Sequence, residues 1–163
     1  MADTHVLALR AGSFFEVFHE ALGLIAQQGI NADAIAADVR IPMIATGDIA
    51  EVAAGALRAR DWEGFVVRDL LGQRDLSYAE ATSIIGERIG KPELEYVQLP
   101  GAEMAAVLTQ AGFSAEVAEL HLELTRALSE GRIRAREERN PRNTTSTRFE
   151  AFADELAAAY PPA

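Results

Sequence analysis

The residues best placed to do chemistry in this sequence follow its first strand-like segment. Residues 5–12, HVLALRAG, are short and apolar on both faces, which is typical of a buried strand. Ser13, Phe14, Phe15 and Glu16 come directly after it. Ligands of open α/β sheets gather beyond the carboxyl ends of the strands, so these four residues are candidates to line a pocket. The alternative interpretation is that both phenylalanine rings pack in the core, because they stand at helical spacing.

Other reactive side chains are few and scattered. Lys91 is the only lysine, and no tyrosine precedes it by four places, so a Tyr-x-x-x-Lys pair cannot form. The sequence has no cysteine and three dispersed histidines. His121 and Glu123 fall on different faces of a helix, because only residues three or four apart meet. We therefore expect no metal site and no thiolate chemistry.

Two segments have the composition of phosphate-binding sites. Residues 86–91, GERIGK, have one residue too few for a phosphate-binding loop and Pro92 where a serine or threonine is needed, so we interpret them as the end of a helix. Residues 131–146 are polar and contain five arginines: Arg132, Arg134, Arg136, Arg139 and Arg142. Guanidinium groups bind phosphate well, so this segment is either a phosphate or partner site or a solvated loop.

Composition limits the classes of function. The chain has 163 residues, enough for one domain with a core, and a formal net charge of −10. This charge disfavours nucleic-acid binding. No apolar run approaches the length of a membrane span, and the first residues lack the basic segment of a secretory signal. With the absence of cysteine, these features predict a cytoplasmic protein that does not enter membranes.

Strand-like and helix-like segments alternate along the chain. We expect strands at 5–12, 41–45, 64–72 and 94–100, and a mixed connection at 30–40. Helices are expected at 14–29, from Asp48 to about Ala59, at 77–90, 101–111 and 115–130, and from Thr147 onward. Three capping boxes are predicted, namely Asp48 with Glu51, Ser77 with Glu80, and Thr147 with Glu150. This alternation predicts an α/β fold.

The order of these segments resembles a known family. "LALRAGSFFE", "IPMIATGDIAEVAAGAL", "GFVVRDLLGQRDLSYAEATSIIGERIGKPELEYV" and "TSTRFEAFADE" are similar, in this order, to the NmrA-like family of atypical short-chain dehydrogenase/reductases. The resemblance covers nearly the whole chain but only the carboxy-terminal half of the family. The family pattern Arg-Pro-Gly-x-Phe-x-Glu-Asn is matched at Arg10, Gly12, Phe14 and Glu16 and not at Ala11 and Val17.

The resemblance implies a partial Rossmann-like domain with a helical carboxy-terminal part. We expect a small, mostly parallel or mixed sheet with flanking helices. The expected divisions are 1–130 for the α/β substrate-side half, 131–146 for the arginine-rich arm, and 147–163 for a helix that packs back on the domain. The site implied for a small-molecule ligand comprises Arg10, Gly12, Ser13, Phe14, Phe15 and Glu16.

Two functions remain open at this stage. Family members include NAD(P)H-dependent quinone-type reductases and redox-sensing regulators, so the chain is either the substrate-binding half of a reductase or a non-catalytic regulatory module. NAD(P) is the cofactor implied by the family, but the sequence lacks the glycine-rich turn that binds it, so we expect none bound by this chain alone. We expect either a homodimer or association with a missing amino-terminal half, because the first strand would otherwise have an open edge.

Overall fold

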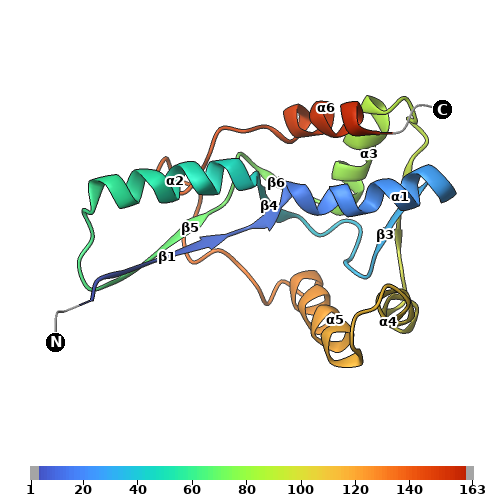
Figure 1. Ribbon diagram of the computed structural model, residues 1–163, viewed down its shortest axis with the longest axis horizontal. Helices are drawn as coiled ribbons and strands as arrows, with labels where there is room; N and C mark the ends of the chain where they lie inside the picture. The colour runs from blue at the N-terminus through green and yellow to red at the C-terminus, as the bar shows by residue number, and fades with distance from the viewer. Residues whose placement is uncertain (1–3, 161–163) are drawn as a thin grey trace.

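The structure is a computed structural model that describes residues 4–160 (Figure 1). Its strands are β1 (Val6–Ala11), β2 (Ser13–Phe14), β3 (Ile30–Asp33), β4 (Ile41–Ile44), β5 (Phe65–Leu70), β6 (Asp75–Leu76) and β7 (Glu95–Gln98). Its helices are α1 (Phe18–Gln28), α2 (Thr46–Ala59), α3 (Tyr78–Arg88), α4 (Gly101–Gln110), α5 (Ala115–Ser129) and α6 (Phe149–Ala159), with a short 3-10 helix at Phe15–Val17.

The strands form small parallel and mixed sheets. β1 pairs with β5, β2 with β4, and β3 with β7, all in parallel, while β6 runs antiparallel to β4. Figure 1 shows α2 and α6 on one side of the strands and α4 and α5 on the other. The predicted α/β class and mostly parallel or mixed sheet are therefore confirmed.

An aromatic cluster forms the centre of the core. The ring centroids of Phe15 and Phe149 lie 5.0 Å apart, and those of Phe18 and Phe149 lie 5.3 Å apart. Leu156, seven residues after Phe149 and on the same face of α6, is also fully buried. Burial of each such side chain contributes roughly 1.5–3 kcal/mol, so α6 is held on the domain by its apolar stripe.

The helix expected at 14–29 begins later than its spacing predicts. Phe14 belongs to β2, where it pairs with Ile44 and is exposed, and α1 starts only at Phe18. The expected stop is correct, because Gly29 ends α1 in the left-handed conformation with φ 71°. Pairing with a strand thirty residues away thus overrides the local helical period.

A strand also replaces part of the connection expected at 30–40. β3 pairs with β7, which lies about sixty residues later in the sequence. Asn31 and Asp33 gave the segment a polar composition, but the Asn31 side chain is buried and its amide donates to the Thr82 hydroxyl at 2.8 Å. A satisfied buried amide is compatible with a strand, which composition alone could not indicate.

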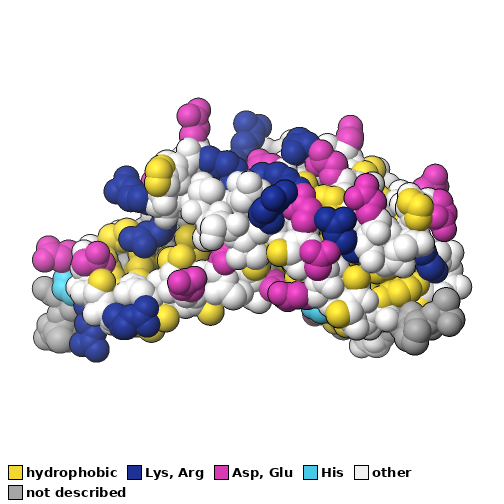
Figure 2. Space-filling model, turned by 90° about the horizontal axis from the view of Figure 1, so that it is seen from above, with side chains coloured by type: hydrophobic (Ala, Val, Ile, Leu, Met, Phe, Trp, Pro, Cys, Tyr) yellow, Lys and Arg dark blue, Asp and Glu magenta, His cyan; other side chains and the backbone are white. Residues whose placement is uncertain are grey.

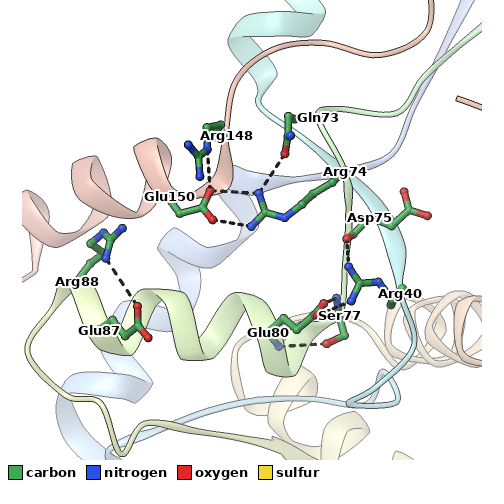
Figure 3. A network of polar contacts seen from close by, with 10 residues as sticks. All are labelled: Arg40, Gln73, Arg74, Asp75, Ser77, Glu80, Glu87, Arg88, Arg148 and Glu150. Carbon is green, nitrogen blue, oxygen red and sulfur yellow. Dashed lines mark hydrogen bonds and ion pairs between the residues drawn. The ribbon is translucent and has the colours of Figure 1, made fainter. Parts of the chain in front are cut away.

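The Ser77–Glu80 capping box is confirmed. The Glu80 N–H donates to the Ser77 hydroxyl at 3.1 Å, and the Ser77 N–H donates to the Glu80 carboxylate at 2.9 Å (Figure 3). This second bond is the main reason that the pKa of Glu80 is lowered, and the Arg40 guanidinium adds to the effect.

The other two capping boxes are wrong, because each expected cap bonds elsewhere. Asp48 lies inside α2, and its carboxylate accepts from the Thr147 hydroxyl at 2.6 Å. The first N–H of α2, on Thr46, donates instead to Glu16 at 2.9 Å. α6 begins after Arg148 without a side-chain cap. Partners distant in sequence have taken these polar groups.

The burial expected for the first strand is also wrong. No residue of β1 is fully buried, because β5 is its only partner within residues 4–160. α2 likewise has no fully buried residue. Both elements keep apolar surface that a larger sheet would cover.

The segment 131–146 lies against the end of β5. Arg139 donates to the carbonyl oxygens of Leu71 and Gly72 at 2.9 and 2.6 Å, and the Leu71 N–H donates to the Asn143 carbonyl at 2.8 Å. The mobility of this arm and the three domain divisions stay predictions. No helix within residues 4–160 combines the length and the apolar character that crossing a membrane requires.

Candidate functional site

A cavity of about 310 Å³ lies at the carboxyl ends of β1 and β5. The register of this parallel pair places Arg10 opposite Asp69, and both residues line the cavity. Gly12 and Ser13, which follow β1, line it as well. This is the position at which ligands bind in open α/β sheets.

Most of the remaining cavity wall is apolar. It is contributed by the ends of β1 and β5, by β4, by α5 and by the arginine-rich segment, through Ala11, Ile41, Pro42, Leu71, Leu124, Leu128, Ile133 and Ala135. Ile133 to Ala135 also form a wall of a neighbouring cavity. Part of the arginine-rich segment is thus built into the candidate site, rather than lying wholly in solvent.

Gly12 is required by the close approach of two chain segments at the cavity. A Cβ atom at this position would lie 2.4 Å from the Pro42 carbonyl oxygen. The Gly12 N–H donates to the Leu70 carbonyl at 2.9 Å, which holds the end of β1 against β5. The missing side chain therefore lets β4 and the end of β1 meet behind the pocket.

An ion pair between an exposed arginine and a buried aspartate supplies the polar part of the site. The Arg10 guanidinium lies 3.2 Å from the Asp69 carboxylate, whose side chain is only 3% exposed. The Arg136 N–H also donates to this carboxylate, and Arg10 donates to the Arg134 carbonyl at 3.4 Å. A buried carboxylate needs such partners, so Asp69 fixes both Arg10 and the arginine-rich segment.

The structure separates the site residues expected from the sequence into two groups. Arg10, Gly12 and Ser13 line the cavity. Phe15 packs in the core, Phe14 is exposed, and Glu16 binds the amino-terminus of α2, so none of these three is among the lining residues. A role in ligand binding stays a prediction for the whole set.

Sequence reasoning missed several lining residues. Asp69 could have been found, because strand 64–72 was expected and the ends of parallel strands lie together. Arg134 carried a signal as a member of the arginine-rich segment. Leu124 and Leu128 carried none, since the apolar face of a helix indicates packing without naming what it packs against.

A buried tyrosine, Tyr78, interacts with Ser13, which lines the cavity. Burial first, and then the Asp33 charge, raise the pKa of Tyr78 to about 12, although an interaction with the Ser13 side chain opposes both. Its phenol therefore stays protonated near neutral pH and can act only as a neutral hydrogen-bonding group. Tyr78 joins the core aromatic rings, with its centroid 5.4 Å from that of Phe18.

A second polar cluster joins α5 to β3. His121 Nε2 lies 3.4 Å from the Asp33 carboxylate, and this contact raises the pKa of His121. The Tyr96 hydroxyl donates to the Ile35 carbonyl at 2.8 Å beside it. In the part of the chain described, no three His, Cys, Asp or Glu side chains gather closely enough to hold a metal ion.

Solved structures resemble this chain over about half their length. An NADPH-dependent quinone oxidoreductase from Escherichia coli, solved with NADPH, matches 92% of this chain and 53% of its own, with 20% identity and a TM-score of 0.76. A nucleoside-diphosphate-sugar epimerase from Staphylococcus aureus matches 91% and 51%, with 18% identity and a TM-score of 0.71. NmrA, a negative transcriptional regulator solved with NADP, matches 94% and 48%, with 14% identity and a TM-score of 0.56.

No protein-family profile and no characterised protein sequence matches this chain. At the identities above, the structural similarity establishes the fold alone. The neighbours include NmrA and quinone oxidoreductases, as the resemblance in sequence predicted, and also an epimerase. The chain therefore has the fold of NmrA-like proteins over about half of their length.

Proposed function

We propose that this chain is the substrate-binding half of an NmrA-like, NAD(P)-dependent oxidoreductase and is not catalytic alone. The observation that carries the proposal is the cavity at the carboxyl ends of β1 and β5, which has an apolar wall and a single fixed ion pair. Its volume lies at the lower limit for small-molecule pockets. An apolar quinone-type molecule is a suitable substrate for it, and a quinone oxidoreductase is among the structural neighbours.

NAD(P) is the cofactor of the proposed complete enzyme. Structural neighbours were solved with NADPH, NADP or NAD. Binding of a dinucleotide requires a glycine-rich turn between a strand and a helix, where backbone N–H groups meet the pyrophosphate. The sequence has no such turn, so we expect the nucleotide to bind only when a second polypeptide segment supplies it.

The β1–β5 pair supports association with another chain. Val6 and Phe65 are register partners at the beginning of the two strands, and Phe65 is 73% exposed. Unpaired backbone groups along a strand edge attract a further strand. We propose that this edge is covered either by an amino-terminal half or by a second copy of this chain. Light scattering over a range of concentrations tests the second option, and a monodisperse monomer at tens of micromolar, roughly the range of weak association, would contradict self-association.

A regulatory module is the second candidate. It is favoured by the similarity to NmrA, a negative transcriptional regulator. In that case the cavity binds a small molecule without turnover. The acidic, cysteine-free composition supports a cytoplasmic protein without nucleic-acid contacts of its own, for either function.

Nuclear magnetic resonance titration with menadione, a neutral naphthoquinone, tests the proposal. We expect the amide signals of Gly12, Leu71 and Ala135 to shift, and that of Gly112, beyond α4, to remain in place. Calorimetry with NADPH should give no submicromolar binding to the chain alone. Amide shifts that menadione causes evenly over the whole surface would contradict the substrate site. Tight binding of NADPH would contradict the proposal that this chain is only the substrate-binding half of an enzyme. Menadione binding without reduction, once NADPH and a glycine-rich partner are both bound, would favour the regulatory module.

A further inference from the structure

The charges around the cavity are unbalanced. Two guanidinium groups, on Arg10 and Arg134, and one carboxylate, on Asp69, belong to its lining residues. The cavity therefore has a formal charge of +1 in a chain whose net charge is −10. A local excess of positive charge on an acidic protein attracts anions to that place.

Asp69 has no capacity left to neutralise the second arginine. Its carboxylate already faces Arg10 at 3.2 Å and accepts the Arg136 N–H. Arg134 is exposed, its Nε donates to the Gly131 carbonyl, and no carboxylate within residues 4–160 forms an ion pair with it. Its two terminal nitrogens are thus available to a ligand, and a guanidinium fork fits a carboxylate well.

The apolar wall determines the rest of the ligand. Leu71, Leu128 and Ile133 offer surface to a hydrocarbon body and no hydrogen-bonding side chain. A phosphate or sugar would leave its polar groups unpaired against this wall. We propose that the cavity takes small aromatic monocarboxylates, with the ring against the apolar wall and the carboxylate on Arg134 beside the Arg10–Asp69 pair. This inference rests on the proposed function and narrows it: among quinone-type aromatic molecules, the cavity should favour those that carry one carboxylate over neutral ones.

Paired probes test the charge separately from the pocket. 2-Naphthoate and 2-naphthalenemethanol have the same ring and differ in charge, and both can be titrated against the amide signals of Gly12 and Ala135. We expect the carboxylate to bind about tenfold more tightly, equivalent to about 1.4 kcal/mol. This preference should weaken as salt is added, because the arginine is exposed.

Arg134→Gln is the informative variant, because a change at Arg10 would leave Asp69 buried without its partner. Arg134→Gln should reduce the preference to about twofold or less and leave the affinity for the alcohol unchanged. Arg132→Gln is the matched control, since Arg132 pairs with Glu130 at 2.7 Å and does not line the cavity. It should keep the tenfold preference.

Each other result has a distinct meaning. Equal binding of the two probes at the cavity, or a preference that persists in Arg134→Gln and at high salt, would overturn the carboxylate inference and leave the proposed substrate cavity intact. Failure of both probes and of menadione to shift the cavity amides would overturn the proposed function, and this inference with it.

Discussion

Glu150 provides the sharpest test of how the carboxy-terminal helix is held. Its carboxylate receives two hydrogen bonds from Arg74, at 2.7 and 3.2 Å, and Arg148 lies 3.5 Å away (Figure 3). The side chains of Arg74 and Glu150 are only 31% and 24% exposed. Hydrogen bonding from Arg74 is the largest cause that lowers the pKa of Glu150 to about 2.

The pKa sets an upper limit on the energy involved. A fall from 4.5 to about 2 corresponds to about 3.5 kcal/mol at most, since one pKa unit is about 1.4 kcal/mol. Solvent screening of a partly exposed pair reduces this, so we expect Glu150→Gln to cost about 1–2 kcal/mol of unfolding free energy at neutral pH. Because the folded pKa is depressed, the stabilisation is complete above about pH 4.5 and is lost as the pH falls toward 2.

Urea denaturation of the wild type and of Glu150→Gln at pH 7 and pH 3 measures this difference. The stability gap should shrink by more than half between the two conditions, because at pH 3 the carboxylate is mostly protonated in the unfolded chain, which offsets most of the stabilisation of its ionised form in the folded protein. Glu155→Gln is the matched control, because Glu155 lies exposed on the same helix and forms none of the ion pairs found within residues 4–160. An unchanged gap at pH 3, or an equal loss in the control, would refute the ion-pair explanation.

Four further outcomes are expected. Gly12→Ala should cost about 1–3 kcal/mol, because its Cβ would clash with the Pro42 carbonyl, and thermal melting should show the loss together with weaker menadione binding. Asp48→Ala should cost about 1 kcal/mol through the lost bonds to the threonine before α6, with no change in menadione affinity, and a calorimetric melt checks the first value. His121→Gln should destabilise the protein more at about pH 5.5 than at pH 8.5. The pKa of His121 is raised in the folded protein, so the stabilisation by the protonated ring is complete below the ordinary pKa of about 6.5 and is lost as the pH rises above the folded pKa. Limited proteolysis should cut first within 131–146, and full protection of the isolated monomer would contradict a mobile arm.

Local signals in the sequence predicted most elements of this fold. The Ser77 capping box and the stop at Gly29 are correct because the bonds that define them lie within four residues. The same logic is wrong for Asp48, whose carboxylate bonds a residue ninety-nine positions away. A carboxylate near the start of a helix can cap that helix or bond a group distant in sequence, and only the tertiary structure decides between the two.

The strands show the same limit of local sequence signals. β1 and β5 carry apolar runs that identify them without their partners, whereas β3 contains Asn31 and Asp33 and is recognisable only from its pairing with β7. Phe14 was assigned to a helix because its spacing fits one, yet it pairs with β4. Short strands depend on neighbours more than on composition.

The candidate site combines both situations. Arg10 and Gly12 could be expected at the end of the first strand, while Asp69, α5 and the arginine-rich segment reach the cavity only through tertiary packing. All of these walls come from this one chain, whereas the open surface lies at the far end of the β1–β5 pair, around Phe65. The ligand binding and the association proposed above would therefore involve different parts of the β1–β5 pair. Under the proposed function, a partner would have to supply the nucleotide site but not the walls of this cavity.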